Sequence, residues 1–521
     1  MAKLVLVERL LATCPDVDRL FLLIRRKKET SAEERLQQLK ESQAFDDLRE
    51  KSPKLLDKMT VVAGDITQPL LGIERQDIDL MRNVSVVFHS AATLKFEEPL
   101  AAAVDQNVRP VISIMKLCDS MPNIQVFVYV STAYSNAELS VVEEKVYPPL
   151  RPLAQLLSLA EHAPELLAEL TPKYIHPKPN TYTFTKAMAE VAVSEHGCNG
   201  YPIAIFRPTI VVSSLKYPHP GWVENLNGPS GVVVGAGKGL LHVLHCKPEL
   251  RADLLPVDVA IDSLIAELSG KLQFAGVPVS NSLCCNELFN FQISYYLVNR
   301  PSNPAVYNCS TGGASGAGAP TWRQFTAAMR RNLRRHPLDS TYWYPCGYAP
   351  PNKLAYTVLA FLLQTVPLYL AEYSLKLLGR KSKLSFITIN RRLQAMNSVL
   401  TFFMTREWRF PGERLRALRD KLAPADAALF TISPDHIDWD DHNVNFVKGA
   451  RKYLLKEKDE NISKAKRHLQ KMFYLHYGCQ ILLGALVFRL ALYNKFVKDV
   501  VYRSARMLMT IYGNFVSNLL H

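Results

Sequence analysis

Short apolar runs alternate with helix-like segments through the first 210 residues, and this alternation constrains the fold more than any other feature of the sequence. The runs lie at 20–24, 60–63, 84–88, 125–130 and 203–206. Between them apolar residues recur with helical spacing, most clearly at 99–118 and 181–196, and the same spacing is present at 3–12. Strands and helices that alternate in this way are typical of a parallel sheet covered by helices on both faces. We therefore predict a Rossmann-like, doubly wound α/β domain.

Ligands of such folds bind at the carboxyl ends of the strands. The run 20–24 is apolar throughout, which predicts a strand buried on both faces, and it is followed by Arg25 and Arg26. Guanidinium groups suit the 2′-phosphate of NADP, whereas a carboxylate at this place would accept from the ribose hydroxyl of NAD. These residues therefore favour NADPH, and a solvated basic strand end is the alternative.

Two further turns complete the predicted cofactor site. Gly64 is followed by Asp65 and Ile66, where the carboxylate could accept a hydrogen bond from the adenine amine. After the run 84–88, the small side chains of Ala91 and Ala92 would let a dinucleotide lie close to the backbone. Each turn by itself is equally compatible with an ordinary loop.

Tyr182 and Lys186 form the predicted catalytic pair, because one helical turn puts the phenol and the ammonium on the same face. The ammonium favours the phenolate, so we expect it to lower the pKa of Tyr182 and to allow proton exchange with a carbonyl oxygen near neutral pH. The strand at 125–130 ends in Ser131 and Thr132. We expect Thr132, or as second choice Ser131, to bind the substrate oxygen.

In order and spacing, these residues resemble the extended short-chain dehydrogenase/reductases and, within them, the fatty acyl-CoA reductases, most of all the insect branch. The matching motifs are Leu22-Leu23-Ile24-Arg25, Gly64-Asp65-Ile66, Ser131-Thr132-Ala133-Tyr134, Tyr182-x-x-x-Lys186, Phe206-Arg207-Pro208-Thr209 and Pro220-Gly221-Trp222. The likeness continues through 234–239 into a C-terminal module of the male-sterility type at roughly 350–455. The resemblance implies an NADP-binding reductase domain at 1–335, a male-sterility-type domain at 336–460 and a membrane-associated helical tail at 461–521.

The reaction implied by this resemblance is an NADPH-dependent, four-electron reduction of a long-chain fatty acyl-CoA to a primary alcohol, through an aldehyde. Tyr182 would donate a proton to the carbonyl oxygen, and Thr132 would hold this oxygen. Lys186 would lower the pKa of Tyr182 and hydrogen-bond the nicotinamide ribose, while Pro208 would lie beside the nicotinamide ring. The scheme needs no metal.

The resemblance breaks at the start of the chain. The family begins with a strand and a Thr-Gly-x-x-Gly-x-x-Gly turn that binds pyrophosphate at a helix N-terminus, whereas this sequence starts inside the helix that should follow. We expect the first strand of the sheet to be missing, its two neighbours to have unpaired edges, and cofactor binding and stability to be weak. The Gly-rich stretch 312–318 is interpreted as a flexible connection rather than as the lost turn.

The charge balance and the cysteines exclude several classes of function. Lys and Arg outnumber Asp and Glu by 62 to 48, a net charge of +14, and basic residues gather between 372 and 421 beside apolar stretches. Such clusters suit an anionic membrane surface, and without a nucleic-acid-binding signature we expect no nucleic-acid partner. The nine cysteines are scattered and contain no C-x-x-C pair, which argues against a disulfide framework or a structural zinc site.

Two apolar segments in the C-terminal third indicate contact with a membrane. Residues 354–371 are just long enough to cross a bilayer core, which leaves a span, an interfacial or re-entrant helix and a buried helix open. Residues 473–488 are a second candidate, and the tail 496–520 has the composition of an interfacial helix. The resemblance implies an enzyme that faces the cytosol from the endoplasmic-reticulum or peroxisomal membrane.

Two other functions compete with the leading one. The missing Gly-rich turn suggests a non-catalytic, lipid-binding relative. The third hypothesis is another membrane-bound extended reductase, which acts on a sterol-like substrate. The acidic run 435–442 is interpreted as a solvated helix start rather than as a metal site.

Overall fold

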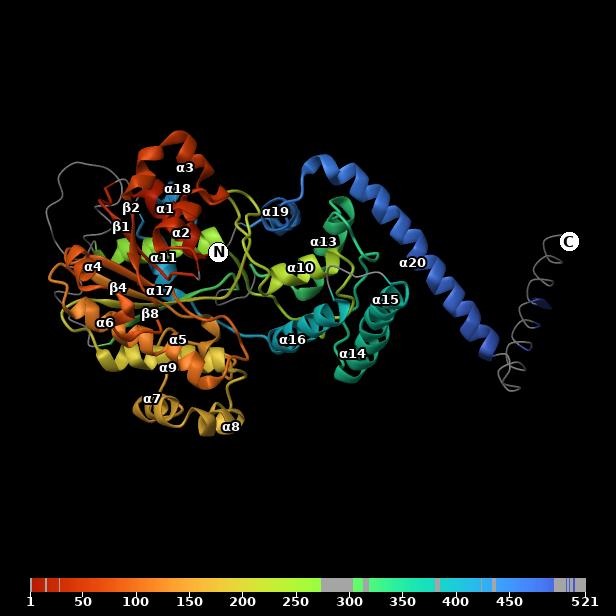
Figure 1. Cartoon of the computed structure of the whole chain (residues 1–521), viewed down its shortest axis with the longest axis horizontal. Helices are drawn as coiled ribbons and strands as arrows, with labels where there is room; N and C mark the ends of the chain where they lie inside the picture. The colour runs from red at the N-terminus through yellow and green to blue at the C-terminus, as the bar shows by residue number, and fades with distance from the viewer. Residues whose placement is uncertain are drawn as a thin grey trace.

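Parallel β-strands form the centre of the N-terminal part of the molecule (Figure 1). The structure, a computed structural model, describes residues 2–272, 303–312, 318–379, 385–422, 424–432 and 437–491 without residues 15 and 28, together with residues 503, 506, 509 and 510. The strands are β1 (Leu20–Ile24), β2 (Met59–Ala63), β3 (Val86–His89), β4 (Val126–Val130), β5 (Ile203–Pro208), β6 (Ile210–Val212), β7 (Leu254–Pro256) and β8 (Ala305–Cys309). All five predicted strands are therefore confirmed, with ends shifted by at most two residues.

The strands belong to separate ladders rather than to one continuous sheet. β1 pairs with β2, the order β3-β4-β5-β8 forms a second sheet, and β6 pairs with β7, all in parallel. Among the described residues, β1 and β3 each have one strand neighbour, so the expected unpaired edges are confirmed. The prediction that 20–24 is buried on both faces is wrong: β1 is half-buried and Leu23 is 37% exposed. The physical reason is that β1 stands at an open edge: among the described residues it pairs with β2 alone, so solvent reaches its side chains.

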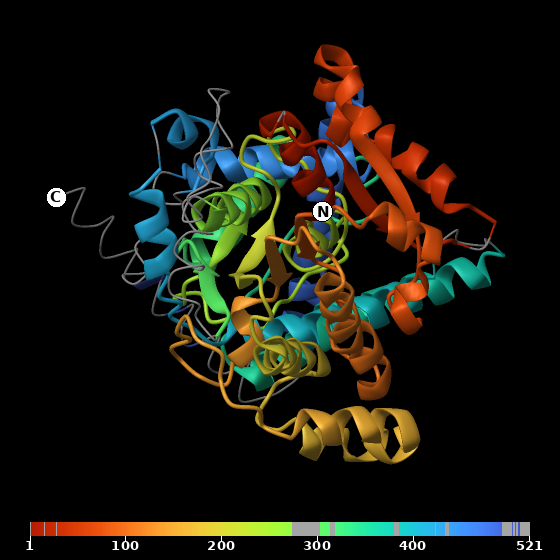
Figure 2. The ribbon, with the colours of Figure 1, turned by 90° about the vertical axis from the view of Figure 1, so that its left-hand side faces the viewer.

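Helices cover both faces of these strands, as predicted for a doubly wound domain. One face packs against α1 (Ala2–Thr13), α2 (Ala32–Lys40), α3 (Asp46–Lys51) and α11 (Val257–Leu272), and the other against α5 (Leu100–Asn107), α6 (Arg109–Asp119) and α9 (Thr181–His196). Helices α7 (Leu153–His162) and α8 (Pro164–Tyr174) form an outer layer over α9, drawn in gold at the bottom of Figure 2. The predicted helix 99–118 is in fact two helices, because the backbone breaks at Val108 just before Pro110.

A second, helical core follows at the opposite end of the molecule (Figure 1). It contains α10 (Pro229–Gly237), α13 (Trp322–Arg335), α14 (Lys353–Ala360), the π-helical turn η6 (Phe361–Thr365), α15 (Val366–Leu377), α16 (Phe386–Met404) and α19 (Trp439–Gly449). In contrast, α17 (Glu413–Arg419) returns to the sheet, where Leu415 and Leu418 join the core of α1 and α11. The two cores are thus built from interleaved segments of the chain.

Among the described residues, two helices are long and apolar enough to cross a membrane, by length and composition alone. One runs from Lys353 to Leu377, and the other runs from Asp459 to Leu490 and includes all of α20 (Ile462–Ala491) except its last residue. Three sequence interpretations fall wholly or partly outside the described residues: the Gly-rich stretch at 313–317, the acidic run at 435 and 436, and the tail 496–520 apart from residues 503, 506, 509 and 510. Within that acidic run, Asp438 accepts hydrogen bonds from Asp440 N (3.0 Å) and Asp441 N (3.1 Å) and caps α19, as a helix start would.

Candidate active site

Helix α9 presents the predicted catalytic pair. Asn180 caps it by accepting a hydrogen bond from Thr183 N at 2.9 Å, so the helix begins immediately before Tyr182. Tyr182 and Lys186 follow on one face at the usual spacing of one turn. The first turns of this helix are almost wholly buried, over residues 181–193. This burial holds Tyr182 and Lys186 against the carboxyl end of β4.

The two hydroxyl groups after β4 have different partners. The Thr132 side chain hydrogen-bonds Tyr182, and its Oγ1 also accepts from Tyr134 N at 3.3 Å. The Ser131 hydroxyl points elsewhere and donates to Glu190 Oε1 at 2.5 Å. Of the two predicted candidates, Thr132 is therefore the one placed beside the phenol.

The pKa of Tyr182 is raised, not lowered as the sequence predicts. Burial raises the pKa of Tyr182 above the usual range, and the hydrogen bond with Thr132 only partly offsets this. The Lys186 ammonium donates to Val130 O at 2.8 Å and lies 4.8 Å from the centre of the Tyr129 ring. Burial lowers the pKa of Lys186 to about 7, against the opposing charge of Glu190. The reason for the difference is the burial of both groups, because desolvation raises the pKa of Tyr182 and lowers that of Lys186.

Glu190, which was not among the predicted residues, holds neighbouring side chains of the site in place through buried hydrogen bonds. It is 1% exposed and bonds Arg207 through two contacts, from Nε at 2.9 Å and from Nη2 at 2.5 Å, in addition to Ser131. Arg207 also donates to the carbonyl oxygens of Glu143 and Lys145. A charged residue one turn after Lys186, in an otherwise apolar helix, is the sequence signal that could have pointed to it.

Asn107 is a second residue that sequence reasoning missed. It is 1% exposed, accepts from Thr93 N at 2.9 Å and donates to Thr185 Oγ1 at 2.9 Å. It thereby ties the loop after β3 to the catalytic helix between Tyr182 and Lys186. Its amide stands at the end of α5 in an apolar stretch, so only the tertiary contacts reveal its place.

The predicted cofactor residues lie at the carboxyl ends of both sheets. Arg25 and Asp65 approach to 3.5 Å at the ends of β1 and β2, while Arg26 is exposed beside them and Ile66 is half-buried. Burial works against ionisation of Asp65, but hydrogen bonds from Thr67 and the charge of Arg25 together lower its pKa.

The four-stranded sheet supplies the remaining cofactor residues. Ala91 and Ala92, both half-buried, follow the end of β3, and Pro208 ends β5. His89 Nε2, at the end of β3, is buried without a hydrogen-bond partner among the described residues. Lys3, in the first turn of α1, lies close enough to lower the pKa of both His89 and Lys186 by charge repulsion. The sequence predicts no residue for the pyrophosphate of the cofactor, and Lys3 brings a positive charge to this edge.

Aromatic rings line the other side of Tyr182. The Phe96 ring contacts Tyr182 at 5.1 Å between centres and Phe403 at 5.9 Å, and Phe403 contacts Tyr134 at 5.0 Å. Phe403 lies at the end of α16, so the second core contributes directly to the wall of the catalytic site. This contact between distant parts of the chain had no signal in the sequence.

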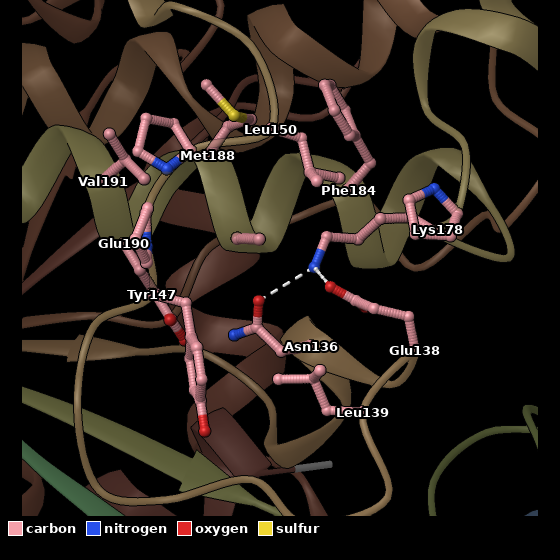
Figure 3. A pocket seen from close by; sticks show the side chains of 14 residues that line it. Asn136, Glu138, Leu139, Tyr147, Leu150, Lys178, Phe184, Met188, Glu190 and Val191 are labelled. Atoms are coloured by element: carbon pink, nitrogen blue, oxygen red, sulfur yellow. Dashed lines mark hydrogen bonds and ion pairs between the residues drawn. The ribbon is translucent and has the colours of Figure 1, made fainter.

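A cavity of about 240 Å³ lies on the opposite face of α9 (Figure 3). Phe184, Met188 and Val191 line it, and Tyr182 and Lys186 do not. Lys178 is held at its edge by Asn136 Oδ1 (2.9 Å) and Glu138 Oε1 (2.6 Å). The cavity is therefore separate from the catalytic pair.

Comparison with known proteins identifies two matching families. An NAD-binding model described as Male sterility protein matches residues 3–264, and the Sterile model, also described as Male sterility protein, matches residues 363–457. Fatty acyl-CoA reductase 1 of Xenopus laevis is 33% identical over 487 residues, which cover 93% of this chain and 88% of that protein. Fatty acyl-CoA reductase 2 of Bos taurus is 30% identical over 489 residues, with 93% and 89% coverage.

Solved structures show the same fold. The terminal R domain from the myxalamid PKS-NRPS biosynthetic pathway superposes with a TM-score of 0.54, at 15% identity, over 88% of this chain and 90% of that one. The parallel Rossmann-like domain followed by a helical region is thus an arrangement shared with this R domain.

Proposed function

Because the chain belongs to the fatty acyl-CoA reductase family, we propose that it reduces a long-chain fatty acyl-CoA to a primary alcohol, through an aldehyde, with NADPH. The observation that carries this proposal is the placement of Thr132 against Tyr182 at the end of β4, with Lys186 one turn away. The relatives are reductases by name, which favours catalysis over a lipid-binding role without chemistry and over reduction of a sterol-like substrate.

The residues at the strand ends fit a nicotinamide dinucleotide. Lys3 and Lys186 offer positive charge near the middle of the site, and Ala91 and Ala92 leave the backbone of the β3 turn accessible to a large ligand. Pro208 would lie beside the nicotinamide ring. When bound, this group supplies the hydride for each of the two reduction steps.

The preference for NADPH over NADH is assigned to Arg25 and Arg26. Both are exposed at the carboxyl end of β1, where a 2′-phosphate would reach them. Asp65, paired with Arg25, would accept from the adenine amine and orient the guanidinium.

Tyr182 acts as the proton donor to the carbonyl oxygen in this scheme. Its raised pKa keeps the phenol protonated before the reaction, which suits a general acid. Thr132 holds the same oxygen and the Tyr182 hydroxyl together. Lys186, fixed by Val130 O, would contact the nicotinamide ribose and stabilise the phenolate that forms when Tyr182 gives up its proton.

We also place the enzyme at a membrane, facing the cytosol, and at the endoplasmic reticulum or the peroxisome. The two long apolar helices support this placement, since they expose large side chains such as Leu354, Leu377 and Leu482. Long-chain acyl substrates partition into lipid, so a membrane surface is where they are available.

The test is a Tyr182→Phe variant expressed in cells that make no fatty alcohol of their own. We expect alcohol production to fall by about 10²- to 10⁴-fold, the usual contribution of a general acid, with the protein level unchanged. Tyr348→Phe is the matched control, because this tyrosine is 44% exposed and its backbone bonds His242 and Leu244. Unchanged alcohol production in Tyr182→Phe would refute the assignment, and a sterol product would identify the other reductase class.

A further inference from the structure

The helix that spans α14, η6 and α15 has two faces of opposite character. Residues facing the body are buried or half-buried and lie eight, four, four and three positions apart: Tyr356, Gln364, Leu368, Glu372 and Leu375. The opposite face carries large apolar side chains that are 48% to 89% exposed: Leu354, Val358, Phe361, Leu362, Leu370 and Leu377. Large apolar faces are rare on the water-exposed surface of a protein, so this face marks an interaction site.

Polar contacts attach the first turns of this helix to the body. Tyr356 Oη accepts from Asn397 Nδ2 on α16 at 2.9 Å, and its ring stacks on His245 with 5.4 Å between centres. The start of the helix is thus held by both α16 and the segment before β7.

The middle and the end of the helix are attached in the same way. Gln364, which is 2% exposed, accepts from His242 N at 3.3 Å and donates to Asn390 at 3.4 Å. Glu372 accepts from Phe386 N at 2.7 Å, at the start of α16. The 25 residues from Lys353 to Leu377 therefore lie along the body over their whole length, about 37 Å at 1.5 Å per residue.

This attachment is incompatible with a helix that crosses the bilayer. A crossing would carry α16 into the hydrocarbon, including the exposed Arg391 and Arg392 and the exposed Gln394, which bonds Thr365 at 3.2 Å. Each arginine at the bilayer centre costs about 2.5–3.5 kcal/mol or more. The polar contacts of Gln364 and Glu372 would have to break or enter the hydrocarbon as well.

We propose that α14, η6 and α15 form an in-plane membrane-docking helix, whose exposed apolar face inserts into the lipid surface while its other face stays on the protein. This inference rests on the proposed membrane association and specifies its geometry. Lys353 at one end, Lys376 near the other and the arginines of α16 would meet anionic headgroups. In Figure 1 these helices lie at the end of the molecule remote from the sheet, on the side toward which α20 extends.

Helix α16 links the docking helix to the candidate catalytic site. α16 lies along the docking helix, where Phe386 N donates to Glu372 and Asn397 donates to Tyr356. Near its C-terminal end the Phe403 ring contacts Phe96, which lies beside Tyr182. The 19 residues of α16 span about 28 Å. α16 thereby connects the docking helix, along which it packs, to the aromatic side chains beside Tyr182.

The test measures the depth of single positions in the full-length protein bound to phosphatidylcholine–phosphatidylserine vesicles. A genetically encoded fluorescent amino acid replaces Leu354, Leu362, Leu370 or Leu377 in turn, and lipids with a quencher at a shallow or a deep position are compared. These side chains are exposed, so the fold should tolerate the probe. Leu482 on α20 is the positive control, and the exposed Leu166 on α8 is the negative control.

An in-plane helix predicts strong shallow quenching at all four positions, with shallow-to-deep ratios that agree within about twofold. Deep quenching at Leu362 and Leu370 with shallow quenching at the two ends would show a span and overturn the proposal. Quenching at Leu482 alone would mean that α14 and α15 do not touch lipid. Probes that are shielded without any quenching, in a concentration-dependent way, would show that a second copy covers the face. If Leu482 is also unquenched, the membrane association itself fails.

Discussion

At the scale of single residues, the catalytic site depends on buried charges that oppose one another. Lys186 is desolvated, and among the described residues Lys3 lowers its pKa further while Glu190 raises it. Glu190 in turn is held by Arg207 and Ser131. The protonation of Lys186 is therefore set by its burial and by charged groups outside the proposed catalytic pair.

Replacement of Glu190 by Gln should move the pH dependence of the reaction. The charged form of Lys186 is needed to stabilise the Tyr182 phenolate, so kcat/KM should fall as the pH rises through about 7. Without the Glu190 charge the pKa of Lys186 drops, and this alkaline limb should shift to lower pH. Breaking the buried pair with Arg207 should also lower stability by about 3–5 kcal/mol.

Ser131→Ala is the control for this shift, because it removes one hydrogen bond of Glu190 and leaves the charge in place. Its pH profile should match that of the unmodified enzyme. The same alkaline limb in Glu190→Gln, measured on folded protein, would contradict the role given to Glu190.

The cofactor preference can be tested at Arg25 and Arg26. The double change to alanine should raise the KM for NADPH by about 10- to 100-fold, since one or more charge-assisted hydrogen bonds to the 2′-phosphate are lost. The KM for NADH should stay the same, because NADH has no phosphate at this position. Arg75→Ala, at an exposed arginine that begins α4 (Arg75–Leu80), is the matched control. Equal effects on both cofactors would show that these arginines do not select NADPH.

At the scale of elements, close approach of the backbone joins the two cores. A Cβ at Gly221 would lie 1.9 Å from Asn445 O on α19, and a Cβ at Gly449 would lie 1.8 Å from Gly221 O. Gly221 also has a φ of +76°, which disfavours any side chain. The loop around Trp222, identified in the sequence as a motif, is therefore the surface on which α19 rests.

Gly221→Ala should lower the free energy of unfolding by at least about 2 kcal/mol, from backbone strain plus the displaced α19. Thermal unfolding of the purified enzyme measures the effect. Gly478→Ala in α20 is the control, because nothing lies within 4 Å of its added methyl group, and it should be neutral or slightly stabilising. An unchanged melting temperature in Gly221→Ala would show that α19 is not seated on this loop.

At the scale of the whole molecule, α1 links the sheet to the C-terminal part of the chain. Arg9 bonds Asp262 on α11 at 2.7 Å and Leu429 O at 2.9 Å. The neighbouring Glu8 is 5% exposed, one of its oxygens is unpartnered among the described residues, and burial raises its pKa to about 7. A buried carboxyl of this kind costs stability whenever it is ionised.

The sign of this effect gives a test. The folded state binds the Glu8 proton more tightly than the unfolded state, so this group makes stability fall as the pH rises from about 4.5 to about 7. Glu8→Gln should remove this loss and raise the melting temperature more at pH 8 than at pH 5. Glu50→Gln, an exposed position on α3, should change neither value. An equal effect of Glu8→Gln at both pH values would contradict the assignment.

The sequence alone determined the local elements and the chemistry of the strand ends. Apolar runs along the chain predicted all five early strands. The residue types that follow these strands, or begin the helix after them, predicted which side chains gather at the strand ends: Arg25, Asp65, Thr132, Tyr182 and Lys186. Both predictions depend on neighbours along the chain. The tertiary structure decided what depends on distant neighbours: the burial that raises the pKa of Tyr182, the network of Glu190 and Arg207, and the contact of Phe403 with Phe96. It also decided that residues 353–377 lie along the body. A spanning helix and an attached helix can have the same length and hydropathy, and only the polar contacts of this helix with the body distinguish the two.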